Sequence, residues 1–257
     1  TWNDEEKGAI WKTALKNGAP QKLTSEKGIY RQPSYAPDGS KIVNYKESGN
    51  SAMGNADGVN PGIYWMNVDG GESHFVTDDG QNPSFNNSGN RIFYQKGGFL
   101  FGSLDKSYCS VNLSGEDKKV HFHSKYANQF NLSPDNKWLA FGELYHVYVV
   151  PFANHGKTFE LSGTLKTMPI AKVSDGAGIN LQWSGDGEKV HWTLGSTYST
   201  VELKNCFSFL EGAPDSIGEI KKEVIDIDLT LETDQPKGTL ALTNARIITM
   251  DGDQVIE

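Results

Sequence analysis

Two histidines separated by a single residue, His121 and His123, are the first side chains that could do chemistry. Alternation along a strand would place both imidazoles on one face, where two nitrogen ligands could bind zinc. The flanking residues are mostly charged or polar, namely Lys118-Lys119-Val120 and Ser124-Lys125-Tyr126. They form neither a glycine-rich segment nor an apolar strand that would place the two histidines in a buried metal site. The pattern therefore favours a strand with surface histidines, and we predict no metal site in this chain.

Three carboxylates near the C-terminus, Asp226, Asp228 and Glu232, are the second candidates, because paired carboxylates can hold a cation or exchange protons. They alternate with a row of apolar residues, which comprises Ile225, Ile227, Leu229 and Leu231. This alternation predicts a half-buried strand whose polar side faces solvent and opposes aggregation. The sequence also contains no G-x-S-x-G and no EF-type calcium loop. We therefore predict no catalytic and no cofactor-binding residue.

The composition limits the classes of partner. The chain has 257 residues, with 24 Lys and Arg against 32 Asp and Glu and a formal net charge of -8. A nucleic-acid or anionic-membrane binder needs a dense basic face, so both classes are disfavoured. No apolar run approaches the ~20 residues that span a bilayer. Cys109 and Cys206 are too far apart in sequence to form a Cys-based zinc motif.

A turn motif that recurs four times indicates how the chain is built. In each copy a large residue precedes a turn of the Asp-Gly, Ser-Gly or Asp-Asn type, and a further apolar residue follows the turn. The four large residues are Tyr35, Phe85, Leu132 and Trp183, which lie 50, 47 and 51 residues apart. Such turn residues tolerate positive φ and are typical of β-hairpins.

A second type of strand pair alternates with these hairpins. Residues 8–24 and 62–77 share it, with Ile10 to Gly18 and Ile63 to Gly71 both spanning eight steps. Two strand pairs per period of about 50 residues predict a β-propeller blade. We expect an all-β fold with about four to five four-stranded antiparallel blades. The ring should be incomplete, with self-association through exposed blade edges; a compact four-bladed closure is the alternative.

These motifs resemble the TolB-like propeller family, whose blades carry a W-S-P-D-G hairpin followed by I-Y-x-M-D-x-D-G-G. The segment from Gly62 to Gly71 is especially similar, and the resemblance covers residues 8–205. TolB-like propellers usually have six or seven blades, so the resemblance implies further blades before Thr1. It also implies a periplasmic or secreted protein.

The C-terminal residues resemble a different family. The segment from Ala241 to Glu257 is similar to the first β-sandwich hairpin of amidohydrolase-superfamily enzymes. We therefore divide the chain into propeller blades (1–222) and a segment (223–257) with the last propeller strand and a short β-hairpin. The resemblance implies a catalytic (β/α)-barrel after Glu257, and a divalent, zinc-like metal there. No cofactor is expected in this chain.

The resulting hypothesis is a non-catalytic propeller that docks on the barrel of a metal-dependent amidohydrolase and gates it. The substrates would be amides, peptides or cyclic ureides. Its partners would be the missing blades and the catalytic barrel, and not nucleic acid or a membrane. The alternatives are a TolB-like interaction module without enzyme activity, a propeller related to prolyl oligopeptidase, and a propeller-fold polyuronate lyase. The apolar insertion at Asn205–Glu219 either docks on the next domain or packs into the final blade.

Overall fold

A computed structural model describes residues 8–26, 28–47, 60–98, 102–153, 156–235, 237–239, 241 and 243–256. Strands dominate these residues, and the described part contains one helical turn, η1 (Leu203–Asn205), of the 3-10 type. The chain divides into two compact units, Thr1–Ile227 and Asp228–Glu257. None of the described helical residues forms a helix long and apolar enough to cross a membrane.

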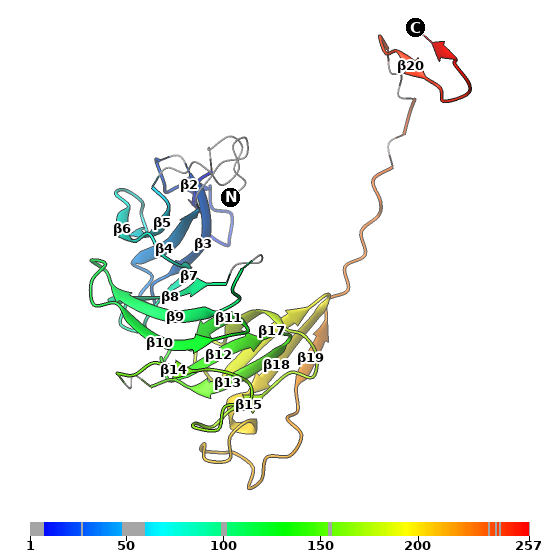
Figure 1. Ribbon diagram of the computed structural model, residues 1–257. Helices are drawn as coiled ribbons and strands as arrows, with labels where there is room; N and C mark the ends of the chain where they lie inside the picture. Colours follow the sequence, from blue (N-terminus) through cyan, green and yellow to red (C-terminus); the bar gives the residue numbers. More distant parts are fainter. Residues whose placement is uncertain are drawn as a thin grey trace. The chain divides into compact units, whose positions relative to one another are not determined.

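Four antiparallel sheets form the first unit, as the repeat predicts (Figure 1). The first sheet contains β3 (Ile29–Tyr35), β4 (Lys41–Glu47), β5 (Gly62–Asn67) and β6 (His74–Thr77). The second contains β7 (Gln81–Phe85), β8 (Arg91–Gly97), β9 (Lys106–Asn112) and β10 (Lys119–Ser124). The third contains β11 (Ala127–Leu132), β12 (Trp138–Glu143), β13 (His146–Pro151) and β15 (Ala171–Lys172). The fourth contains β16 (Ile179–Trp183), β17 (Lys189–Leu194), β18 (Thr197–Glu202) and β19 (Glu223–Asp226).

The repeated turn fixes the register of the first two strands in every blade. Each large residue pairs with the residue seven positions later, and the pairs are Tyr35–Ile42, Phe85–Ile92, Leu132–Leu139 and Trp183–Val190. One residue in each turn has positive φ, namely Gly39, Gly89, Asn136 and Gly187. Glycine and asparagine adopt positive φ at little energetic cost. Their place in the repeated motif therefore predicts which residue of each turn has positive φ.

Apolar side chains between adjacent sheets form the core. One cluster joins the first two blades around Val43, Ile92 and Val111. A second joins the second and third blades, and a third joins the third and fourth. The innermost strands lie side by side, with β3 beside β7 and β11 beside β16 (Figure 1). The second and third blades thus bury both of their faces against neighbouring blades, as blades inside a propeller do.

Carboxamide side chains reinforce the contact between innermost strands. Gln32 and Gln129 occupy the same position of the repeat, three residues before the large residue. Oε1 of Gln32 accepts a hydrogen bond from the backbone N–H of Asn82 at 2.7 Å. Oε1 of Gln129 accepts one from the N–H of Leu181 at 3.4 Å. Both glutamines lie at register shifts in the pairing of their own strands. A register shift locally interrupts the hydrogen bonding between paired strands.

The long connection after β13 adds a strand to the sheet of the second blade. Within it, β14 (Phe159–Glu160) pairs in parallel with β10, through Phe122–Phe159 and His123–Glu160. The second sheet therefore has five strands, and the fifth comes from the following blade. Leu161 and Phe152 pack into the core between the second and third blades. The connection thus fastens the two blades together.

Strands before and after these sheets complete the described architecture. β1 (Trp11–Lys12) and β2 (Gln21–Lys22) form a two-stranded sheet, which confirms the predicted N-terminal strand pair. Ile10 and Leu23 pack with Tyr30, Ile42 and Met66 of the first blade. In the second unit, β20 (Ile247–Ile248) and β21 (Val255–Ile256) form the predicted short β-hairpin.

The prediction of a long half-buried strand after Glu223 was wrong. β19 ends at Asp226, and its four residues are all exposed. The exposed fractions of Ile225, Ile227, Leu229 and Leu231 are 61%, 55%, 74% and 75%. The core clusters contain none of these four residues, so within the described part of the chain no packed side chains cover the apolar face of the segment. Alternating apolar and polar residues predict a strand with one apolar face. They do not predict whether another part of the chain covers that face.

Candidate functional site

The two histidines of the H-x-H motif are not brought together. The pairing of β9 with β10 shifts register between Val120 and Phe122, so His121 is the bulged residue. Nε2 of His121 lies 2.7 Å from Oγ of Ser110, and Nδ1 of His123 lies 2.8 Å from Oγ of Ser107. Positions 107 and 110 of one strand point to opposite faces, so the imidazoles do too. This arrangement rules out a zinc site shared by the pair.

The expectation of two surface histidines was right for His123 and wrong for His121. His123 is exposed, whereas His121 has an exposed fraction of 8%. The bulge turns His121 toward the aromatic core, where its ring lies 5.3 Å from that of Phe93 and 5.2 Å from that of Phe152. Sequence alternation could not reveal this orientation, because one extra residue reverses the face of every side chain after it.

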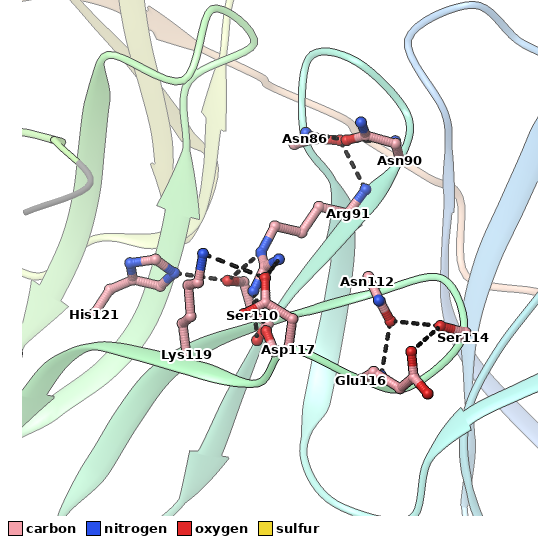
Figure 2. A network of polar contacts seen from close by, with 10 residues as sticks. All are labelled: Asn86, Asn90, Arg91, Ser110, Asn112, Ser114, Glu116, Asp117, Lys119 and His121. Atoms are coloured by element: carbon pink, nitrogen blue, oxygen red, sulfur yellow. Dashed lines mark hydrogen bonds and ion pairs between the residues drawn. The ribbon is translucent and has the colours of Figure 1, made fainter. Parts of the chain in front are cut away.

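His121 lies at one end of a polar network, which it contacts through Ser110 (Figure 2). Nε of Arg91 donates to Oγ of Ser110 at 2.7 Å, and Nη1 of Arg91 binds Oδ2 of Asp117 at 2.7 Å. Lys119 also contacts Asp117, at 3.3 Å. Arginine has no acceptor whereas a neutral imidazole has one, so the hydroxyl of Ser110 can donate its proton to Nε2 of His121. In that tautomer the imidazole carries its own proton on Nδ1.

The electrostatics favour the neutral form of the His121 imidazole. Burial first, and then the charges of Arg91 and Lys119, lower the pKa of His121 to about 4. In a Ser–His pair the imidazole can activate the serine hydroxyl as a nucleophile. Ser110, however, is fully buried, with an exposed fraction of 0%. No substrate atom can reach the hydroxyl without the blade opening. The network therefore holds β8, β9 and β10 together and is a structural feature.

The carboxylates predicted as a solvated face lie in the exposed segment that follows β18. Oδ1 of Asp226 accepts a hydrogen bond from Oγ1 of Thr197 at 3.2 Å. Asp228 and Glu232 are exposed in the extended chain beyond β19. Across the described residues, no group of three or more His, Cys, Asp and Glu side chains is placed to hold a metal ion.

The insertion at 205–219 packs partly into the final blade. Cys206 and Phe207 are buried in the core cluster between the third and fourth blades. The Phe207 ring stacks on Trp138 with centroids 4.8 Å apart. Phe209 also lies against Trp138, at 6.4 Å, but remains 61% exposed. Of the two predicted alternatives, these residues follow the second, with one aromatic face left at the surface.

A pocket of about 530 Å³ lies beside this insertion. Its apolar part consists of Trp138, Leu203 and Leu210. Its charged part includes Glu202, whose carboxylate contacts Nζ of Lys189 at 3.0 Å and of Lys204 at 2.9 Å. These two ammonium groups lower the pKa of Glu202, so the carboxylate stays ionised and cannot serve as a proton donor near neutral pH. Glu202 is therefore not a candidate general acid in this pocket.

Comparison with known proteins shows the fold. No family model matches the sequence, and no curated protein matches it. Among solved structures, TolB from Acinetobacter baumannii superposes with a TM-score of 0.58 at 15% identity, over 86% of this chain and 49% of that one. A protein described as a TolB from Agrobacterium tumefaciens gives 0.54 at 14% identity, over 77% of this chain and 71% of that one.

A third similar structure is the periplasmic gluconolactonase PpgL from Pseudomonas aeruginosa. It superposes with a TM-score of 0.53 at 15% identity, over 91% of this chain and 67% of that one. At such identities the likeness defines the fold and not the activity. The chain thus has a TolB-like β-propeller fold and spans about half the length of the A. baumannii TolB.

Proposed function

We propose that the chain is a non-catalytic β-propeller module that docks on the catalytic barrel of a metal-dependent amidohydrolase and restricts access to it. The observation that carries this proposal is the hairpin β20–β21, which lies in a separate unit after the last blade. It carries the residues Ala245-Arg246-Ile247-Ile248-Thr249-Met250-Asp251-Gly252, which resemble the opening hairpin of that superfamily. The proposed substrates are amides, peptides or cyclic ureides.

The division of labour follows from the polar groups of the propeller. Its Ser–His pair is buried beneath the blade surface, and its pocket carboxylate is held ionised by two lysines. The hydrolytic chemistry would belong to the catalytic barrel, where a divalent metal would lower the pKa of a bound water. The propeller would contribute a rigid surface beside the active site.

A hydrolysis assay tests the absence of catalysis. The purified chain should not hydrolyse amide, dipeptide or cyclic ureide substrates, with or without added zinc. His123→Gln and Ser110→Ala variants serve as controls, since each removes one hydroxyl or imidazole from β9 or β10. Turnover by the chain that either substitution abolishes would contradict the proposal. Binding of the chain to the polypeptide encoded directly after Glu257, measured by calorimetry, tests the docking.

The second candidate is a TolB-like interaction module without any associated enzyme. The register of the C-terminal hairpin favours it, since Ile248 pairs with Val255 seven residues later, as Tyr35 pairs with Ile42. By this interpretation the hairpin is another propeller hairpin rather than the start of a hydrolase. Pull-down of a partner protein by the chain, with no hydrolase domain in the same reading frame, would favour the second candidate.

A periplasmic or secreted location is part of the proposal. One of the similar structures is described as periplasmic, and an exported protein of this fold needs no disulfide because its core is extensive. Fractionation of the source cells, followed by immunoblotting, tests it. Recovery of the protein with cytosolic markers alone would contradict the proposed location.

A further inference from the structure

The pocket beside the insertion combines an apolar wall with charged groups, and every residue that lines it belongs to the first unit. Its volume of about 530 Å³ is in the range of small-molecule sites, roughly 300–1,000 Å³. Trp138, Leu203 and Leu210 form the apolar wall. The charged groups come from the turns before β12 and β17, from the end of β18 and η1, and from the insertion. The pocket thus has the two kinds of lining that bind an amphipathic molecule.

Backbone hydrogen bonds hold the lining segments in place. The N–H of Leu203 donates to the carbonyl of Glu188 at 2.8 Å, which joins η1 to the turn before β17. Within the insertion, the N–H of Leu210 donates to the carbonyl of Phe207 at 3.2 Å. The carbonyl of Leu210 in turn accepts the N–H of Ala213 at 3.1 Å. The pocket is therefore formed before any ligand binds, which lowers the entropic cost of binding.

The ammonium groups of the pocket already have carboxylate partners. Lys189 and Lys204 both contact Glu202, as described above. Nζ of Lys137 lies 3.5 Å from Oδ2 of Asp135. An anionic ligand would have to compete with these carboxylates for the three lysines. The pairing therefore disfavours an anion as the occupant.

Two carboxylates of the pocket, those of Glu188 and Glu211, have no such partner. Neither takes part in an ion pair within the part of the chain that the structure describes. A third carboxylate, Asp186, accepts hydrogen bonds from the hydroxyl of Ser184 and from the N–H of Glu188, which lower its pKa. In all, five carboxylates and three ammonium groups line the pocket. The lining therefore carries negative charge that the protein itself does not neutralise.

We infer that this pocket binds a small organic amine, whose ammonium group pairs with Glu188 and Glu211 and whose apolar body covers the apolar wall. A neutral apolar ligand would leave both carboxylates without a partner. An inorganic cation would leave the apolar wall exposed to water. A molecule with both parts satisfies both surfaces, because burial of its body and pairing of its charge act together. The inference goes beyond the proposed function and does not depend on a hydrolase.

A series of four small molecules tests the two parts of the ligand separately. Phenethylamine, phenethyl alcohol and hydrocinnamate share a phenyl ring and differ in charge, whereas ethylamine keeps the ammonium group without the ring. Each is titrated into the isotope-labelled full chain, and NMR follows the indole N–H of Trp138 and the amide of Leu210. Phenethylamine should bind at least about threefold more tightly than the alcohol and at least about tenfold more tightly than ethylamine. Hydrocinnamate should bind most weakly of the three phenyl compounds.

Carboxamide substitutions test the assignment of the charge. The combined Glu188→Gln and Glu211→Gln variant keeps the size of both side chains and should bind phenethylamine at least about threefold more weakly. Its affinity for phenethyl alcohol should not fall. The combined Glu72→Gln and Glu160→Gln variant is the matched control, because it removes two exposed carboxylates outside the pocket. If circular dichroism shows that the first variant does not fold, each single substitution replaces it, with an expected loss of about twofold.

Three outcomes would overturn the inference. Equal affinity for phenethylamine and its alcohol would show that the carboxylates do not select a cation. An equal loss of affinity in the pocket variant and the control variant would reduce the effect to the overall charge of the chain. Signal changes confined to residues that do not line the pocket would place the amine elsewhere. None of these results bears on the hydrolase, since docking of the following polypeptide is measured separately.

Discussion

The hydroxyl of Ser110 lies 2.7 Å from Nε2 of His121, and both side chains lie beneath the surface of the second blade. The pair has the atoms of a nucleophile and a base but no path for a substrate. Ser110 also accepts a hydrogen bond from Arg91, and His121 packs against aromatic rings. The Ser110–His121 pair therefore connects neighbouring strands. This relationship explains why a motif that suggests metal or nucleophilic chemistry forms a structural contact between the strands of one blade.

Protonation of His121 should weaken the fold in acid. Its pKa is lowered to about 4 from an ordinary value near 6.5, so only the unfolded chain binds the proton between these values. Stability therefore falls as pH drops from about 6.5 to about 4 and levels off below. The loss should be on the order of 2 kcal/mol beyond that of His121→Gln, which keeps an acceptor for Ser110. Urea unfolding at several pH values measures it.

The exposed residue of the same motif provides the control. His123→Gln removes the other imidazole of β10 without touching the buried network. It should retain the wild-type difference in stability between pH 7 and pH 4.5. An identical pH dependence in wild type and His121→Gln would contradict the assignment of the acid sensitivity to His121.

Removal of the acceptor on Gln32 should loosen the contact between the first two blades. Gln32→Met keeps the size of the side chain but cannot accept the N–H of Asn82, at a cost of about 1 kcal/mol. Gln32→Glu retains an acceptor and should preserve the contact. Hydrogen exchange of the Asn82 amide reports the bond directly, and should accelerate in Gln32→Met alone. Equal exchange rates in the two variants would argue that the bond does not form.

The two phenylalanines of the insertion should differ sharply in their importance. Phe207→Ala leaves a cavity against Trp138 and should cost about 3–5 kcal/mol, as for other buried aromatic residues. Phe209→Ala alters an exposed ring and should cost less than about 1 kcal/mol. Thermal unfolding of both variants, with limited proteolysis of residues 205–219, measures the difference. Comparable losses would mean that the insertion does not pack as described.

Both cysteines should resist alkylation in the native protein. Burial raises the pKa of Cys206 to about 12 and that of Cys109 to about 11, so almost no thiolate forms near pH 8. Iodoacetamide should modify neither thiol within an hour-scale reaction, and both should react fully in urea. Mass spectrometry counts the adducts. Rapid native labelling of Cys206 would show that the insertion opens.

The blades could be predicted from sequence because their information is local. Each hairpin contains its own signals: a large residue, a turn with a Gly or Asn at positive φ, and a pairing partner seven residues later. Tyr35 and Ile42 are one such pair. The burial of His121 could not be predicted, since it depends on a bulge in β10. The contact of Arg91 with Ser110 depends on strand order, because 19 residues separate them.

Two further features escaped the sequence pattern for physical reasons. β14 joins the sheet of the preceding blade. It could not be predicted, because a strand of two residues is too short to show a periodic sequence pattern. The alternation from Ile225 to Leu231 predicted burial, yet these residues are exposed, because a pattern specifies a face and not its cover. The Gly- and Asn-rich sequence from Glu47 to Pro61 predicts a loop, and residues 48–59 lie outside the described part of the chain.

Reading the natural coding sequence beyond Glu257 tests the central claim most directly. The account predicts, within about a hundred residues, an apolar strand that ends in H-x-H, followed by further His and Asp residues able to hold a divalent metal. Additional blade motifs encoded before Thr1 would agree with the same account. A stop codon directly after Glu257 would contradict the claim of a hydrolase partner in the same chain and leave a binding propeller.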